Sequence, residues 1–473
     1  MVVVAVIGGL AIAARSPGKA LPGGPPLAPA AMVSAPDTES SAWYCTGQTT
    51  VAGQLAPGSL VLTNTGPRIV RGTIHAVTDT GAQVATGVSV PARSQLVTTV
   101  PAPKSGTWLS EVVMLSGGGV AVSQTLHGAS GWAEAPCQSS TAQQWYFPSG
   151  VTTGSDSLFI ALFNPTSTPD VVDLSFVTPK GIVRPINFQG IVLQSEQTQV
   201  ESIGPFVQEQ DHIATTVTTR TGRLVASELQ LFNGSGSGLA IVPGSARAEH
   251  EWTVPQAAEP VTGSSSIDIF NPGTTTQSVT VRARLATGPL SPFHARVPPQ
   301  TTWVLSTGAQ TRIPKGDPYS AVVVARGGSG VVVGRIVAAP GAEVPQAGMA
   351  DAVDALTART QSRHWVVPGP GSSSAPVVIG AAPAHLAVTN LTGRRETYTV
   401  AVMGPSGFRT FSSGDIAPSA TIFVNGSTLA RAGLDPLIVT ASGTAAVSED
   451  VGPTGAYGAV TMPGIALARS LGG

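Results

Sequence analysis

Four tryptophans recur along this chain at intervals of about a hundred residues, and each of them heads a similar stretch of sequence. They are Trp43 (WYCTGQTT), Trp145 (WYFPSGVT), Trp252 (WTVPQAAE) and Trp365 (WVVPGPGS). A rare aromatic residue that returns in the same context indicates an internal repeat. The repeat restricts the chain to a series of similar units, and we expect each tryptophan to pack on the core of its own unit. The alternative is that the four rings are exposed platforms on which sugars stack.

Other residues recur at nearly constant distances from the tryptophans. An apolar strand follows each tryptophan and ends in an asparagine, at Asn64, Asn164, Asn271 and Asn390. A turn glycine lies 76 residues after the first tryptophan, 77 after the second and 78 after the third and fourth, at Gly119, Gly222, Gly330 and Gly443. An asparagine side chain can hydrogen-bond the backbone of the turn that it begins, so we expect a local structural role for the four asparagines.

Within each unit, short apolar runs alternate with glycine-rich turns, as in WLSEVVMLSGGGVAVSQ and YSAVVVARGGSGVVVGR. This pattern predicts β-hairpins, and about seven strands per unit match an immunoglobulin-type sandwich. The sequence therefore predicts an all-β chain of four tandem immunoglobulin-like β-sandwich units of about 100 residues. Their bounds are 41–139, 140–246, 247–346 and 363–473. The single run with helical periodicity, Met349–Thr360, falls in the junction 347–362.

The N-terminal region differs from the repeats. Residues 1–14 are apolar and too short to cross a bilayer comfortably, which suits the core of a signal peptide or part of a signal-anchor. Residues 15–40 are rich in Pro, Gly and Ala and read as an extended tether. We expect an extracytoplasmic protein that is secreted or anchored to the membrane through its N-terminus. A buried strand or helix is the alternative for the apolar segment.

Charge is sparse in this chain. Only 11% of the residues are charged, the net charge is −1, and the sequence contains no basic run. Nucleic-acid binding depends on a positive field that neutralises phosphates, so the composition argues against a nucleic-acid partner.

The two cysteines lie at opposite ends of the first unit, Cys45 near its start and Cys137 near its end. If the first and last strands of a sandwich lie together, the two thiols come within bonding range. An even cysteine pair in an exported chain predicts a disulfide, and two unpaired buried thiols are the alternative.

The unit LFNPTSTPDVVDLSFVTPKG…HIATTVTTRTGRLVASELQLF resembles a bacterial immunoglobulin-like pattern of exported proteins. The last hairpin of that pattern ends in serine and an acid, as in Ser227-Glu228 and Ser448-Glu449, whereas the other units have Ser123-Gln124 and Gly334-Arg335. As a whole, residues 41–473 resemble an uncharacterised actinobacterial family of secreted or membrane-anchored proteins. The resemblance implies a location in the cell envelope and supplies no catalytic residue.

Motifs that carry chemistry are missing from the sequence. The seven histidines form no H-E-x-x-H or H-x-x-x-H pair, and no G-x-S-x-G, Walker or calcium-loop motif occurs. Ser16 and Lys19 satisfy S-x-x-K, but they lie in the tether. We therefore predict no catalytic, cofactor-binding or metal-binding residue and no cofactor.

We expect a non-catalytic scaffold or binding protein of the cell envelope, built as a rod or compact array, that engages a protein or a cell-wall glycan. The alternative is a cell-wall carbohydrate-active enzyme with a pair of carboxylates between domains, for which Glu249, Glu251 and Glu449 are the candidates. A four-bladed closed ring is disfavoured, because a hundred residues per blade is about double the usual propeller length.

Overall fold

The computed structural model is all-β. It describes residues 31–50, 55–101, 103–233, 238–258, 264–314, 318–339, 349–354, 356–357, 362–369, 385–424, 426–429, 435–451 and 460–468. Within these ranges the helical elements are one 3₁₀ turn, η1 (Ile186–Phe188), and one short helix, α1 (Gly426–Leu429). No helix in the described part of the chain is long and apolar enough to span a bilayer. The apolar segment 1–14 lies outside the described residues.

The first strand set forms two four-stranded antiparallel sheets. Its strands are β2 (Ser41–Thr49), β3 (Gly58–Asn64), β4 (Val70–Thr78), β5 (Gln83–Val90), β6 (Ser94–Thr98), β7 (Trp108–Leu115), β8 (Val120–Gly128) and β9 (Gly131–Pro136). One sheet has the order β2-β7-β4-β5 and the other the order β6-β3-β8-β9. The set has eight strands where the sequence predicts about seven, because β9 adds an edge strand beside β8.

The second set repeats this plan with the sheets β10-β16-β12-β13 and β15-β11-β17-β18, and β14 adds to the first of them. Its strands are β10 (Gln144–Phe147), β11 (Ser157–Asn164), β12 (Asp170–Thr178), β13 (Gly181–Val183), β14 (Ile191–Leu193), β15 (Gln197–Ser202), β16 (Ala214–Thr221), β17 (Val225–Phe232) and β18 (Gly238–Val242).

The third set has the sheets β22-β21-β25-β19-β28, with β23 also beside β21, and β24-β20-β26-β27. Its strands are β19 (Glu251–Ala258), β20 (Ser264–Asn271), β21 (Gln277–Leu285), β22 (Gly288–Pro289), β23 (Phe293–Val297), β24 (Thr301–Ser306), β25 (Pro318–Arg326), β26 (Val332–Ala339), β27 (Met349–Asp354) and β28 (Leu356–Thr357). In the run Met349–Thr360, where the sequence indicates helical periodicity, the described residues form strands, because β27 pairs with the edge of β26 and β28 with the edge of β19.

The fourth set departs from the plan through one long strand. Its strands are β29 (Ser362–Val367), β30 (His385–Asn390), β31 (Glu396–Gly404), β32 (Gly407–Ile416), β33 (Thr421–Val424), β34 (Leu437–Val451), β35 (Val460–Pro463) and β36 (Ile465–Leu467). The hairpin expected at Gly443 is absent, because β34 runs through that glycine and joins the two sheets into one. The other three hairpins have a glycine of positive φ at the equivalent place, at Gly119, Gly222 and Gly330.

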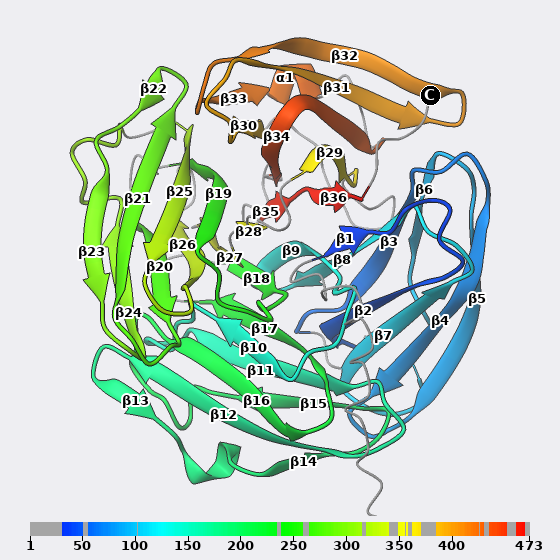
Figure 1. Cartoon of the computed structure of the whole chain (residues 1–473). Helices are drawn as coiled ribbons and strands as arrows, with labels where there is room; N and C mark the ends of the chain where they lie inside the picture. Colours follow the sequence, from blue (N-terminus) through cyan, green and yellow to red (C-terminus); the bar gives the residue numbers. More distant parts are fainter. Residues whose placement is uncertain are drawn as a thin grey trace, which may run out of the picture.

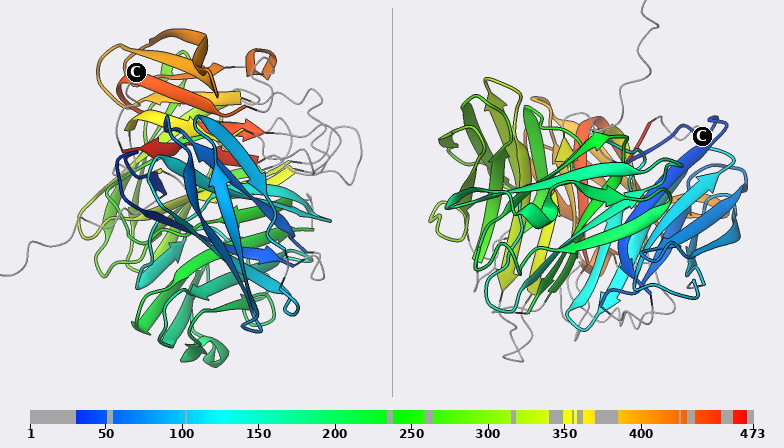
Figure 2. Two further views of the ribbon diagram at one scale, coloured as in Figure 1. Left: turned by 90° about the vertical axis from the view of Figure 1, so that its right-hand side faces the viewer. Right: turned by 90° about the horizontal axis from the view of Figure 1, so that it is seen from below.

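The four strand sets lie around a common centre in chain order, as Figure 1 shows from the blue first set to the orange and red fourth set. Figure 2 gives two views of the same arrangement turned by 90°. A sheet of each set packs on a sheet of the next: β2 lies against β11 and β17, β12 against β24, and β19 against β30 and β34. Near the centre, β9 lies against β18, β18 against β27, and β35 against β9.

The ring is closed by the two ends of the described chain. Strand β1 (Met32–Val33) pairs in parallel with β36, so that Met32 lies beside Ala466. Val33 is buried in one apolar cluster with Val366 and Ile465 of the fourth set and residues of the first set. Part of the expected tether is therefore a strand of the ring. The chain is thus a closed ring, although the sequence disfavours a four-bladed one. Each of the first three sets contributes two sheets, which brings the length per sheet in these sets near that of a propeller blade, and the fourth set contributes one nine-stranded sheet.

The repeated tryptophans are core residues. Trp43, Trp145 and Trp252 each expose 1% of their surface and Trp365 exposes none. The indole nitrogens of Trp145 and Trp252 donate to the carbonyls of Leu224 (3.0 Å) and Val331 (2.7 Å). Rings that are buried in this way cannot serve as sugar-stacking platforms.

The repeated asparagines are turn residues, and all four are buried. The amide of Asn271 donates to the carbonyls of Thr275, Val297 and Pro298, each at 2.9 Å, and its oxygen accepts from the backbone of Gly273 at 3.0 Å. Asn64, Asn164 and Asn390 make the corresponding bonds to the residue four places on and to a more distant strand end. Each asparagine side chain thus makes hydrogen bonds to backbone groups of the turn that it begins and of a neighbouring strand end.

We expect Asn271→Ala to lower the free energy of unfolding by about 2 kcal/mol, because buried carbonyls lose their donor. Urea denaturation followed by circular dichroism measures the change. Thr274→Ala, an exposed change in the same turn, is the control and should stay within about 0.5 kcal/mol of the wild type. Equal midpoints for the two variants would show that the asparagine bonds add nothing to stability.

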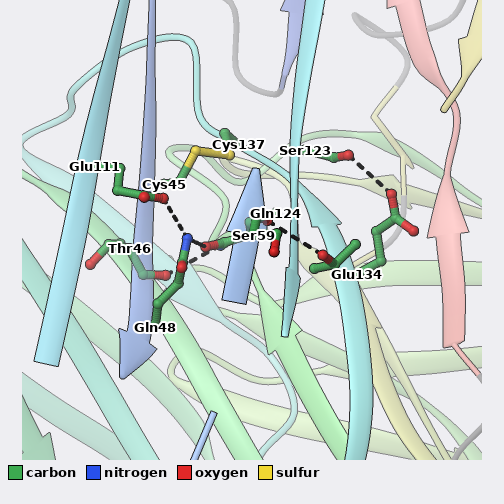
Figure 3. Close-up of a disulfide and its surroundings, with 10 residues drawn as sticks. Cys45, Thr46, Gln48, Ser59, Glu111, Ser123, Gln124, Glu134 and Cys137 are labelled. Carbon is green, nitrogen blue, oxygen red and sulfur yellow. Dashed lines mark hydrogen bonds between the residues drawn. A yellow bond between two sulfur atoms is a disulfide. The ribbon is translucent and has the colours of Figure 1, made fainter. Parts of the chain in front are cut away.

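The predicted disulfide is confirmed. Cys45 on β2 is bonded to Cys137, which directly follows β9, with the Cα atoms 4.8 Å apart (Figure 3). Backbone bonds in both directions between Tyr44 and Gln138 hold the same two segments together. Trp132 lies at the other end of β9 from the disulfide, beside the ring of His127.

Candidate functional site

Polar side chains occupy equivalent buried positions in the four sets, on the strands that pair with the central strands β9, β18, β27 and β35. Gln124, Glu228, Arg335 and Glu449 follow Ser123, Ser227, Gly334 and Ser448 on β8, β17, β26 and β34. They expose between 0% and 6% of their surface. Because two are acids, one is a base and one is an amide, the four positions do not form a symmetric site.

In the first set a polar network lies beside the disulfide (Figure 3). The amide of Gln48 donates to the carboxyl of Glu111 at 2.6 Å and lies 3.4 Å from the oxygen of Gln124. Burial raises the pKa of Glu111 to about 7, and the bond from Gln48 offsets part of that rise. An apolar environment thus holds this carboxyl close to half protonation at neutral pH.

A second buried acid, Glu134, lies on β9 where the first and fourth sets meet. It accepts a hydrogen bond of 3.0 Å from the hydroxyl of Ser123. Burial raises its pKa to about 8; the bond from Ser123 opposes this, and the nearby charge of Glu449 adds to it. Glu134 is therefore largely protonated at neutral pH, and Glu449, one of the candidate acids from the sequence, raises the pKa of Glu134 further through its charge.

We expect Glu134→Gln to flatten the dependence of stability on pH. The folded-state pKa of Glu134 lies above that of the unfolded chain, so its favourable contribution is complete below about pH 4.5 and is lost as the pH rises through 8. The variant should melt at a higher temperature than the wild type at pH 9 and at the same temperature at pH 5. Melting curves from pH 5 to pH 9 test this.

The control for that series is Glu39→Gln, which changes an exposed carboxylate. Its melting temperature should follow that of the wild type at every pH. If Glu134→Gln also follows the wild type up to pH 9, ionisation of Glu134 does not limit stability.

A pocket of 520 Å³ opens between the second and third sets. Its walls come from the loops before β11 and β16 in the second set, and from the face of β20, β24 and β26 that is turned toward the second set. Hydroxyls of Thr153, Ser264 and Ser306 share these walls with apolar side chains such as Val304 and Ile336. The volume falls within the range of sites that hold small ligands.

A fixed polar group lies behind the wall of this pocket, in contact with two of its lining residues, Ser266 and His212. Asp268 of β20 is fully buried and accepts a bond of 2.7 Å from the hydroxyl of Ser266. Its second oxygen lies 2.9 Å from Nδ1 of His212. Burial lowers the pKa of His212, but its bond to Asp268 and the charges of Asp268 and Asp211 outweigh this, so the pKa is raised. Asp268 thus orients the imidazole, and Nδ1 is engaged.

A smaller pocket of 330 Å³ lies further along the same boundary. It is lined by Tyr146, Arg184, Gln189 and Phe270, among others. Side chains two residues apart on a strand share one face, so Ser266, Asp268 and Phe270 form a line along β20 that leads from the first pocket to the second.

Sequence reasoning did not find His212 or Asp268. The available signal was in the strand that ends in asparagine: three residues before that asparagine the other units have Val61, Ala161 and Ala387, and the third has Asp268. The predicted markers, the tryptophans and asparagines, support the frame and do not line this pocket. The described residues contain no cluster of three or more His, Cys, Asp or Glu that could hold a metal ion.

A model described as a family of unknown function (DUF5719) matches residues 111–407. No curated protein matches.

Two solved structures have distant likeness. Thermotoga maritima 1070 is 17% identical, with 24% of this chain and 97% of that chain covered and a TM-score of 0.21. A tetra-tandem repeat in the extending region of a large adhesion protein is 10% identical, with coverages of 91% and 100% and a TM-score of 0.10.

Proposed function

Because the chain belongs to DUF5719, a family of unknown function, we propose a function from its geometry. The protein is a non-catalytic scaffold or binding protein of the cell envelope, and it engages an envelope protein or a glycan. It lies outside the cytoplasm, where it is either secreted or anchored through the apolar segment 1–14.

We propose that the four units are immunoglobulin-like, with the bounds 41–139, 140–246, 247–346 and 363–473. In the first set the pairs β3–β6 and β4–β7 correspond to the B–E and C–F pairs of an immunoglobulin sandwich. Strand β2, the first of the set, pairs with β7, and β3 pairs with β8, the seventh. Relative to an immunoglobulin sandwich, the first and seventh strands have therefore exchanged sheets.

The observation that carries the proposal is the pocket between the second and third sets, held within a closed ring. Sheets that pack on both neighbours fix the walls of that pocket, and rigid sheets can present loops to a partner without chemistry. The Cys45–Cys137 disulfide supports the location, because such bonds persist in oxidising compartments.

The alternative, a carbohydrate-active enzyme, requires two carboxylates on the walls of a cleft. Glu134 and Glu449 are the acids that influence each other, and they expose 5% and 6% of their surface. A pair that is buried among packed strands suits a structural role better than catalysis, so the binding function is favoured.

The test uses the full chain, because a fragment that begins at Ser41 lacks β1 and single units break the ring. The immobilised protein is exposed separately to purified wall glycan and to solubilised envelope proteins. We expect saturable binding to one of them and no release of new reducing ends from the glycan. Steady release of reducing ends would make the protein an enzyme, and absence of binding to either fraction would remove the binding function. Heat-unfolded protein is the control.

A further inference from the structure

We propose that the pocket between the second and third sets binds a neutral saccharide of one or two rings, with His212 as a hydrogen-bonding group of the site. This inference rests on the proposed binding function and adds the place and the ligand class.

The first argument is a comparison of two boundaries. Trp43 pairs with Val113 and Trp145 with Val217, so Trp108 and His212, each five residues earlier, are equivalent. Phe159 and Ser266 are likewise equivalent, each five residues before the strand-ending asparagine.

At the boundary of the first and second sets, Trp108 and Phe159 pack with ring centroids 5.4 Å apart and help to fill an apolar interface. At the boundary of the second and third sets, His212 and Ser266 occupy those places, and a pocket is present.

The second argument is the burial of Asp268. A buried carboxylate paired with a histidine gains little or nothing over apolar packing, and the other three units have Val61, Ala161 or Ala387 at this position. Its two bonds fix the hydroxyl of Ser266 and the ring of His212. Such preorganisation of polar groups beside an open pocket is a feature of binding sites.

The third argument is the chemistry of the walls. A saccharide ring has an apolar face and a rim of hydroxyls, and this pocket has apolar side chains on β24 and β26 with hydroxyls and carboxylates at its rim. Asp156 and Asp211 line the pocket together with His212, the single histidine of its lining, and Asp268 lies behind His212. An anionic ligand would meet more negative than positive charge, so a neutral saccharide fits better.

The test measures binding of neutral oligosaccharides of two to four sugars to the full-length protein by isothermal titration calorimetry, beside matched uronic-acid oligosaccharides. We expect saturable binding of a neutral oligosaccharide that His212→Ala weakens by about tenfold or more, as loss of a hydrogen bond to a ligand would. His294→Ala, which changes an exposed histidine of the third set, should bind as the wild type does.

A second variant separates binding from folding. Ser264 is exposed at the rim, so Ser264→Trp should block the pocket without disturbing the buried Asp268. The proposal is overturned if both variants bind saccharides like the wild type, if only acidic oligosaccharides bind, or if no saccharide binds while an envelope protein does. In the last case the binding function stands and the assigned ligand fails. Loss of binding to every envelope fraction would instead remove the proposed function itself.

Discussion

Replacing Trp145 with alanine is expected to lower the free energy of unfolding by about 3–5 kcal/mol, the usual cost of deleting a buried tryptophan side chain. Trp145 exposes 1% of its surface and lies in the apolar core of the second set, together with Phe147, Leu158 and Val217. Its removal leaves a void between two sheets that are held by neighbours on both faces, so collapse around the void is restricted. Urea denaturation followed by far-ultraviolet circular dichroism measures the loss.

The hydrogen bond of the indole can be tested separately with phenylalanine. Trp145 donates to the carbonyl of Leu224, whereas the indole nitrogen of Trp43 has no hydrogen-bond partner among the described residues. Trp145→Phe should therefore cost about 0.5–1.5 kcal/mol more than Trp43→Phe. If Trp145→Ala leaves the midpoint unchanged, the tryptophans are not the framework that their recurrence indicates.

The second large effect is expected from the disulfide. Cys45→Ala with Cys137→Ala should lower stability by about 4–5 kcal/mol in the chain-entropy model, because the bond closes a loop across 92 residues of sequence. Measured losses for native disulfides commonly lie at about 2–5 kcal/mol. The bond joins the first strand of the first set to the exit from its last strand, so its loss frees both ends of that set.

The matched comparison for this variant is the wild-type protein with the disulfide reduced, which changes no residue. Oxidised and reduced wild type should differ in urea midpoint by the same amount as the wild type and the double variant. A double variant as stable as the oxidised protein would show that backbone pairing alone holds the two segments.

Much of the frame could be predicted from the sequence because local rules determine it. The disulfide, the buried tryptophans and the turn-forming asparagines each depend on a residue type whose physical role is narrow. The hairpin predicted at Gly443 was wrong, because β34 continues through that glycine, whereas the second unit forms its hairpin with a single turn glycine, Gly222.

The ring and the pocket could not be predicted, because both depend on how units pack on each other. Whether Val33 docks on the last strand is decided by contacts between opposite ends of the chain, which periodicity does not record. His212 and Asp268 lie 56 residues apart in different units, and their pairing appears only when the second and third sets pack on each other. The signal in the sequence was Asp268, an acid at a position where the other three units have an apolar residue.

The pairing of β1 with β36 bears on the timing of folding. A chain that emerges from its N-terminus first presents Met32–Val33 long before Ile465–Leu467 exist outside the ribosome or the membrane. Until then the apolar face that Val33 and the first set share with the fourth set has no cover. The nascent protein therefore remains an open arc with an exposed apolar end until β36 has been synthesised, and the pairing of β36 with β1 then covers that end.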